Sequence, residues 1–205
     1  MRRAGSSLAS AANSAPATGV QRQARLATLS DGQLVTLRLM GPDDREKMLV
    51  FARSLPPDDL LFLRSDITQS SNVDDWIRNI QEGATVTVLA EISDSLVGYA
   101  SVHANQALWT RTLGEIRMQV GQPFRGRGLG RLLGAEILRA GQERGLRKMA
   151  AMMTPDQAGA RAAFEKLGFQ IEALLQSWVV DRHGRPRDLI IMSQMLDGIG
   201  TDAAA

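Results

Sequence analysis

Residues 125–130, which read Arg-Gly-Arg-Gly-Leu-Gly, are the most informative part of this 205-residue chain. They follow a strand-like run, Glu115 to Val120, and they begin an amphipathic helix. Glycine at such a junction lets the backbone approach a ligand closely, and a helix N-terminus presents unpaired N–H groups with a partial positive charge. The segment therefore predicts an anion cradle. The alternative is a sharp turn that needs glycine for its geometry alone.

Two common phosphate-binding motifs do not fit this turn. A Walker A loop would need Lys-Ser or Lys-Thr after the glycines, and neither pair is present. A dinucleotide fingerprint starting at Gly126 and Gly128 would need its third glycine at the position that Arg131 occupies. The spacing is instead Arg125-x-x-Gly128-x-Gly130.

The composition is that of one globular domain. Hydrophobic residues make up 44% and charged residues 22% of the chain. The absence of cysteine excludes disulfides and a thiolate nucleophile, and two histidines make a poor metal site, so we expect no metal. No apolar run approaches the ~18 residues of a membrane span. We therefore expect a cytoplasmic protein that does not bind membranes.

The net charge of +2 is unevenly distributed. Residues 1–30 hold four arginines and no acid, so the rest of the chain is slightly acidic. That balance argues against a nucleic-acid footprint. An RNA-binding role for Arg125, Arg127 and Arg131 is further disfavoured by the small number of aromatic residues, 4% of the chain.

The first 31 residues have no hydrophobic period and are rich in Ala, Ser, Gln and Arg, which predicts a disordered tail. The same Arg-rich, acid-poor composition is typical of an organelle transit peptide, and a false upstream start codon is a third interpretation. The segment lacks the apolar centre of a secretory signal. We expect one domain over residues 32–198 and a flexible tail over residues 199–205.

Hydrophobic periodicity predicts alternating strands and helices in this domain. The predicted strands are 34–39, 85–92, 96–103, 113–120, 148–153, 173–180 and 189–196, and the predicted helices are 43–53, 72–80, 129–145 and 155–167. This order predicts an α/β fold, a mixed sheet with helices packed on it.

The Arg125-x-x-Gly128-x-Gly130 spacing, between a fourth strand and its helix, resembles the GNAT N-acetyltransferase superfamily. The downstream segments that also resemble it are 163–169 (Ala-Phe-Glu-Lys-Leu-Gly-Phe), 181–184 (Asp-Arg-His-Gly) and 189–192 (Leu-Ile-Ile-Met). The resemblance covers about residues 34–196. It implies a mixed, mostly antiparallel twisted sheet of about seven strands with about four helices on both faces. It also implies an acetyl-CoA-dependent N-acetyltransferase in which the acceptor amine attacks the thioester directly.

The resemblance further implies which residues hold acetyl-CoA. Met118, Gln119 and Val120 would contact the pantetheine arm. The residues that would hold the pyrophosphate are Arg125, Gly126, Arg127, Gly128, Leu129 and Gly130. Gln157 and Phe164 would lie along the cofactor.

Two positions depart from the family's usual pattern. Phe164 stands where many members have a Tyr that protonates the leaving thiolate, and Phe cannot donate a proton. It therefore either packs or lines the thioester channel, and water would protonate the thiolate. Gln157 stands where many members have an Asn that binds pantetheine. Its local alternative is to complete a capping box with Thr154.

Acetyl transfer needs a neutral amine, so a base must take the amine proton. Our candidate is Glu115, where many family members keep a Glu near the acceptor and where apolar neighbours predict partial burial. The alternative is a structural carboxylate paired with Arg111 or Arg117. His103 is a second candidate base, but we expect it to face solvent, and we expect His183, in a hairpin tip, to be structural or exposed to solvent.

The acceptor is an amine on a small molecule or a protein, and the enzyme is a monomer or a homodimer. The residues that could line the acceptor region are Phe62, Arg64, Asp66 and Trp109, with Arg182, Arg185 and Arg187 on the last hairpin. Those arginines would attract a carboxylate-bearing acceptor or form a solvated basic loop. The rival interpretation of the whole chain is a non-catalytic acyl-CoA sensor of the same fold, which Phe164 favours.

Overall fold

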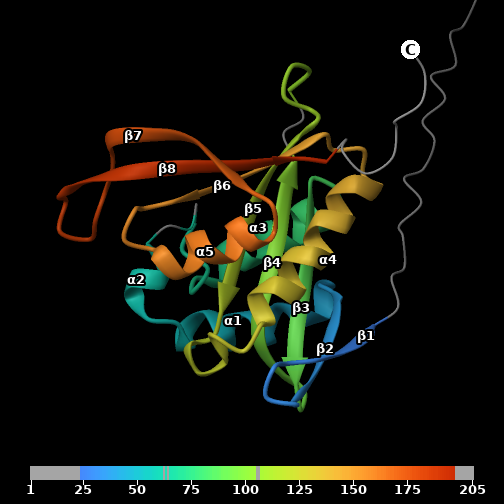
Figure 1. The fold of residues 1–205 in the computed structure, drawn as a ribbon. Coiled ribbons are helices and arrows are strands. Elements are labelled where there is room, and N and C mark those ends of the chain that lie inside the picture. The colour runs from blue at the N-terminus through green and yellow to red at the C-terminus, as the bar shows by residue number, and fades with distance from the viewer. Residues whose placement is uncertain (1–23, 62, 64, 105–106, 197–205) are drawn as a thin grey trace, which may run out of the picture.

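In the computed structural model, which describes residues 24–61, 63, 65–104 and 107–196, the chain forms one sheet with helices on both faces (Figure 1). The strands are β1 (Arg25–Thr28), β2 (Leu34–Leu39), β3 (Thr85–Ile92), β4 (Ser95–Ala104), β5 (Leu113–Val120), β6 (Lys148–Met153), β7 (Gln170–Val180) and β8 (Pro186–Met195). The helices are α1 (Arg45–Ser54), α2 (Pro57–Leu60), α3 (Ser70–Gln81), α4 (Leu129–Glu143) and α5 (Ala158–Lys166), with 3₁₀ turns η1 (Pro42–Asp44) and η2 (Gln122–Phe124). The strand order in the sheet is β1-β2-β3-β4-β5-β6-β8-β7, and only β5 and β6 pair in parallel.

The fold class is the one predicted, an open and mostly antiparallel sheet in an α/β fold. The described residues hold eight strands and five α-helices, against about seven and about four predicted. The additional strand is β1 and the additional helix is α2, each four residues long. Segments this short carry too little periodicity to be recognised from sequence.

The sheet begins inside the segment predicted as a disordered tail. Arg25–Thr28 pairs with β2, Arg25 opposite Leu37 and Thr28 opposite Leu34. Leu29 follows with only 3% of its surface exposed, and it belongs to the main core. The boundary at residue 32 was therefore wrong for residues 24–31, because backbone pairing orders a segment whose own composition could not. Residues 1–23 and 197–205 lie outside the described residues.

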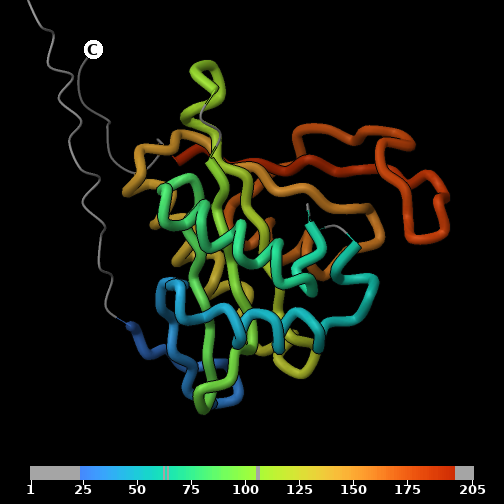
Figure 2. The backbone as a smooth tube through the Cα atoms, turned by 180° about the vertical axis from the view of Figure 1, so that it is seen from behind, coloured from blue at the N-terminus to red at the C-terminus, as the bar shows by residue number. Residues whose placement is uncertain are grey.

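Each face of the sheet covers its own apolar core. Helix α4 packs across β3, β4 and β5 on one face, with Leu129, Leu133 and Ile137 fully buried. Helices α1 and α3 cover the opposite face (Figure 2). There Phe51 and Trp76 pack edge-on against Tyr99. Both arrangements follow from helices with one apolar stripe on strands whose side chains alternate between faces.

The pairing between β5 and β6 ends early. Their register covers only Leu113–Glu115 against Lys148–Ala150, although β5 continues along β4 to Val120 and β6 continues along β8 to Met153. Beyond Glu115 the two strands diverge and the sheet opens into a wedge (Figure 1). The wedge leaves one edge of β5 without a neighbouring strand.

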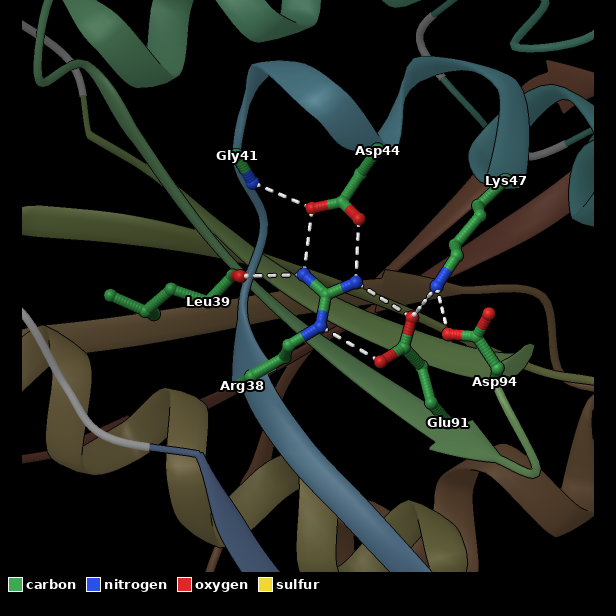
Figure 3. Close-up of polar contacts among 7 residues, drawn as sticks. All are labelled: Arg38, Leu39, Gly41, Asp44, Lys47, Glu91 and Asp94. Carbon is green, nitrogen blue, oxygen red and sulfur yellow. Dashed lines mark hydrogen bonds and ion pairs between the residues drawn. The ribbon is translucent and has the colours of Figure 1, made fainter.

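An ionic cluster joins β2, η1, α1 and β3 (Figure 3). The Arg38 guanidinium donates to Asp44, with Nη2 2.5 Å from Oδ1, and to Glu91, with Nη2 2.6 Å from Oε1. Lys47 donates to Glu91 at 3.0 Å and to Asp94 at 2.5 Å. Asp44 and Glu91 are buried, so the cluster neutralises charge that would otherwise be costly to bury.

The cluster lowers the pKa of both buried carboxyls. Burial raises the pKa of Asp44, but hydrogen bonds from Arg38 and from the Gly41 N–H outweigh it and hold that pKa below its usual value. The hydrogen bond from Arg38 is the main reason that the pKa of Glu91 is lowered, against the opposing effect of burial. Both side chains are therefore ionised at neutral pH.

Candidate active site

The wedge exposes a row of backbone donors on β5. Gly121 donates its N–H to Val97 O at 2.9 Å, on the β4 side. N–H groups alternate between the two edges of a strand, so those of Met118 and Val120, which lie beyond the last residues paired with β6, point the other way, into the wedge. An extended amide-bearing molecule could pair with this edge as a strand would.

The glycine turn lies at the end of the same strand. Gly126 has φ +74° and Gly128 has φ +85°, the left-handed region that glycine adopts without strain. A Cβ at either position would meet nothing within 4 Å, so the backbone angle, and not a clash with the protein, requires glycine here. Gly128 caps α4 without a side-chain hydrogen bond. The first N–H groups of α4 have no acceptor within the helix, as at any helix start, so the turn fits an anionic phosphate group.

The two arginines of the turn have different partners. Arg125 donates from Nε to Val120 O at 3.0 Å and from Nη2 to the Asp59 carboxylate. Arg127 pairs with Asp31 at 2.9 Å on the β1–β2 turn, and its guanidinium lies 5.6 Å from the centre of the Phe124 ring. In this structure both guanidinium groups therefore already have partners within the protein.

The expected pantetheine residues lie along the wedge. Met118 is on the α4 side, where its sulfur would be 3.6 Å from a Cβ at Gly130. Gln119 lies on the opposite face and donates from Nε2 to Asp59 O at 2.9 Å. Asp59, on α2, therefore contacts both β5 and the glycine turn. Asp59 was not predicted as a site residue from the sequence, because no periodicity marks so short a helix.

The candidate base lies in a half-buried polar row across three strands. The side chain of Glu115 is 17% exposed and pairs with Arg117, its neighbour on the same face of β5. Opposite Glu115 on β4 is His103. Its ring nitrogens lie 3.0 Å from Thr85 Oγ1 and 3.0 Å from Ser101 Oγ. His103 is half-buried beside these hydroxyls, and not the freely solvent-facing side chain that we expected, because the β3–β4 register brings it next to Thr85.

The structure gives Phe164 and Gln157 local partners. Phe164 is 7% exposed and packs edge-on against Phe169, with ring centres 5.0 Å apart. Gln157 accepts from the Thr154 N–H at 3.0 Å, which is one half of the predicted capping box. Both residues follow β6, the other side of the wedge.

The residues expected to line the acceptor region lie on separate connections of the chain. Trp109 is 89% exposed on the β4–β5 connection, and Asp66 accepts from its neighbours Thr68 and Gln69. Phe62 and Arg64 lie outside the described residues. His183 is exposed in the hairpin tip, as predicted.

The hairpin arginines all pair with acids. Their pairs are Arg182 with Asp58 at 3.4 Å, Arg185 with Asp181 at 2.9 Å and Arg187 with Asp156 at 2.9 Å. The hairpin is therefore less free to capture a carboxylate than its charge suggested.

Among the described residues, no group of three or more His, Asp or Glu side chains is placed to hold a metal ion. None of the helices in the described part is long and apolar enough to cross a membrane.

Residues 52–169 match the family model described as the acetyltransferase (GNAT) family. That segment contains β5, the wedge and the glycine turn. No curated protein matches the chain significantly by sequence.

Solved structures share the fold. The GNAT superfamily phosphinothricin acetyltransferase of Sinorhizobium meliloti, in complex with acetyl-CoA, has a TM-score of 0.71 at 22% identity, covering 83% of this chain and 92% of that chain. The yncA protein of Salmonella typhimurium, with its cofactor acetyl-CoA, has a TM-score of 0.69 at 22% identity, covering 83% and 99%. The ribosomal-protein-alanine N-acetyltransferase of Brucella melitensis has a TM-score of 0.70 at 23% identity, covering 78% and 98%.

Proposed function

This chain belongs to the GNAT family of acetyltransferases, and we propose that it transfers the acetyl group of acetyl-CoA to an amine of its acceptor by direct attack. The observation that carries the proposal is the wedge, in which free N–H groups of β5 lead directly to the glycine turn. A pantetheine arm has amides that can pair with a strand edge, and a pyrophosphate suits the start of α4. The site therefore fits both ends of the cofactor.

The chain's own groups would orient the reaction. Acetyl-CoA supplies an activated thioester whose carbonyl carbon the amine attacks. The N–H groups of Met118 and Val120 would hold the pantetheine, and the one nearest the thioester would stabilise the oxygen on which negative charge develops. Holding both reactants in place supplies much of the rate through proximity. The C–N bond forms as the C–S bond breaks, and CoA leaves as a thiolate.

Glu115 would accept the proton that the amine loses. It lies on β5, half-buried on the α1–α3 face, and its pairing with Arg117 orients the carboxylate. Arg117 is thus a positioning residue in this proposal. Water would protonate the thiolate, since Phe164 has no proton to give.

A second candidate function is a non-catalytic acyl-CoA sensor. The observation that favours it is Phe164, which is packed against Phe169 at the position where many family members have an acid. Such a module would bind the cofactor and release no CoA with any acceptor.

The test combines turnover with cofactor binding. Purified protein is incubated with acetyl-CoA and a panel of small amines, lysine peptides and peptides with free amino termini, and CoA release and acceptor mass are followed. We expect CoA release with at least one acceptor, which gains the mass of one acetyl group. Binding of acetyl-CoA without turnover across the panel would favour the sensor.

A pair of glycine variants tests the cofactor site. Gly128→Glu places a carboxylate at the cradle and should abolish CoA binding measured by calorimetry. Gly145→Glu is the matched control, because Gly145 also has positive φ (+72°) and open space but lies beyond the other end of α4. Unchanged CoA binding in Gly128→Glu would show that the cofactor assignment is wrong.

A further inference from the structure

Helix α2 is fastened across the mouth of the wedge at three points. Gln119 on β5 donates to the Asp59 carbonyl at 2.9 Å, and Arg125 in the glycine turn donates to the Asp59 carboxylate. Arg182 on the β7–β8 hairpin pairs with Asp58 at 3.4 Å. Figures 1 and 2 both place α2 beside that hairpin, at the end of α1. Helix α2 thus contacts β5 and the glycine turn on one side of the wedge and the β7–β8 hairpin on the other.

The ion pair between Arg125 and Asp59 is the contact with which a bound cofactor would compete. The Arg125 Nε is held by Val120 O at 3.0 Å, which fixes the guanidinium at the end of β5. Its Nη2 donates to the Asp59 carboxylate, which is an anion. A guanidinium binds carboxylate and phosphate oxygens through the same N–H edges, so the two ligands compete for it.

We propose that Asp59 holds Arg125 in the free protein and that the pyrophosphate of acetyl-CoA displaces it, so that cofactor binding releases α2. This inference rests on the proposed function, since it needs the pyrophosphate at the glycine turn. Asp59 is a regulatory residue in this scheme: it does not touch the reacting atoms, and it weakens cofactor binding by competing for Arg125.

Displacement is favoured over joint binding by charge. A pyrophosphate carries more negative charge than one carboxylate, and it also gains the N–H groups at the start of α4. Asp59 beside it would be repelled by the like charge. The arginine therefore changes partner, and α2 keeps only the neutral Gln119 bond on this side.

Arg127 differs from Arg125 in its partners. It is tied at Asp31, it lies against Phe124, and its own carbonyl accepts from the Ser30 N–H at 3.0 Å. Those contacts belong to the β1–β2 turn and do not reach α2. Among the described residues, Arg125 is the one that links the cradle to the connection between α1 and α3, on the face of β5 that carries Glu115. Release of α2 would therefore open that face after the cofactor has bound.

The first experiment measures CoA affinity by calorimetry in the wild type, Asp59→Asn and Asp58→Asn. Removing a competing carboxylate should tighten CoA binding by about fivefold, the size expected of one partly exposed ion pair. Asp58→Asn removes the same charge from the same helix without touching Arg125, so its CoA affinity should be unchanged. Pantetheine, which has no pyrophosphate, should bind the wild type and Asp59→Asn equally.

The outcomes separate this inference from the proposed function. A wild type that does not bind CoA overturns both. A wild type that binds CoA, with Asp59→Asn equal or weaker, overturns the displacement and leaves the proposed function intact. Equal tightening in Asp58→Asn, or with pantetheine, would show a general charge effect and would also overturn it.

The second experiment follows amide hydrogen exchange of residues 58–61 in the wild type, so it does not depend on a variant folding. CoA should speed exchange there by freeing α2, while slowing it at residues 116–131. Arg125→Gln should show fast exchange at residues 58–61 already without CoA. Slower exchange at residues 58–61 on CoA binding would mean that the cofactor fastens α2, which is the opposite of the proposal.

Discussion

Glu115 and Arg117 illustrate how residues two apart on a strand act together. Side chains alternate along β5, so these two project from the same face and their charges meet. The same alternation places Met118 on the α4 face and Gln119 on the α2 face. One strand therefore provides backbone donors at its edge, a carboxylate on one face and packing on the other.

Replacing Glu115 by Gln should lower kcat at neutral pH by about a hundredfold or more, because a general base contributes on that scale. The acidic limb of the pH–rate profile should disappear with it. CoA affinity should stay at the wild-type value, since the proposed cofactor contacts do not involve this side chain.

His103 gives the control for this assignment. It lies opposite Glu115 but is engaged by Thr85 and Ser101. If His103→Gln removed the acidic limb and Glu115→Gln did not, the base would be His103.

At the scale of elements, short contacts between distant segments hold the sheet edge. The cluster in Figure 3 links β2 to β3 and to the start of α1 through Arg38, with its two buried carboxylates 47 residues apart in sequence. No local pattern pairs these residues. The β2–β3 register, with Arg38 opposite Leu89 and Thr36 opposite Glu91, brings them together.

Glu91→Gln should lower the free energy of unfolding by about 2 kcal/mol at pH 7, because it leaves the Arg38 charge half-compensated in a buried site. Since the pKa values of Asp44 and Glu91 are lowered in the fold, their stabilisation is present above the unfolded value near pH 4 and is lost as the pH falls below it. Urea unfolding should thus show the wild type weakening from about pH 5 to pH 3, with a shrinking difference from Glu91→Gln.

Asp94→Asn is the matched control for the ionic cluster. Asp94 pairs with Lys47 in the same network, but its side chain is 87% exposed. The Asp94→Asn protein should have the wild-type urea midpoint both at pH 7 and at about pH 3. A Glu91→Gln protein as stable as the wild type at pH 7 would show that the buried pair gives no net stabilisation.

At the scale of the whole molecule, the wedge divides the sheet into two parts. Strands β1 to β5 form one part and β6 to β8 the other, joined by three residue pairs between β5 and β6 and by helix packing. A ligand in the wedge would contact both parts at once. The missing strand pairing is thus the place where binding can add most to the stability of the fold.

We therefore expect acetyl-CoA to raise the thermal midpoint. At a concentration about 100-fold above its Kd, a ligand that binds only the folded state adds about 2.7 kcal/mol, or roughly 5–10 °C for a chain of this size. Differential scanning fluorimetry measures the shift. The Gly145→Glu protein should keep it and the Gly128→Glu protein should lose it. An equal shift in both variants would place the ligand elsewhere.

The main elements and the glycine turn were accessible from sequence because their signals are local. Apolar runs bounded by turn residues mark β3 and β4, which are buried almost throughout, helical period marks α4, and two glycines that adopt positive φ mark the turn before it. The glycine motif, the order of these elements and the downstream Gly168-Phe169 segment together were sufficient to recognise the family, and the family model confirms it.

The remaining features depend on contacts between residues far apart in the chain. Strand β1 exists only because β2 offers it an edge, His103 is brought next to Thr85 by the β3–β4 register, and Asp59 meets Arg125 across 66 positions. Apart from β1 and α2, the strands, the helices and the glycine turn were recognisable in the sequence, because hydrophobic period and glycine spacing are properties of neighbouring residues. Which charges meet, and how the mouth of the wedge is closed, depends instead on strand register and on the packing of separate elements, which no local pattern contains.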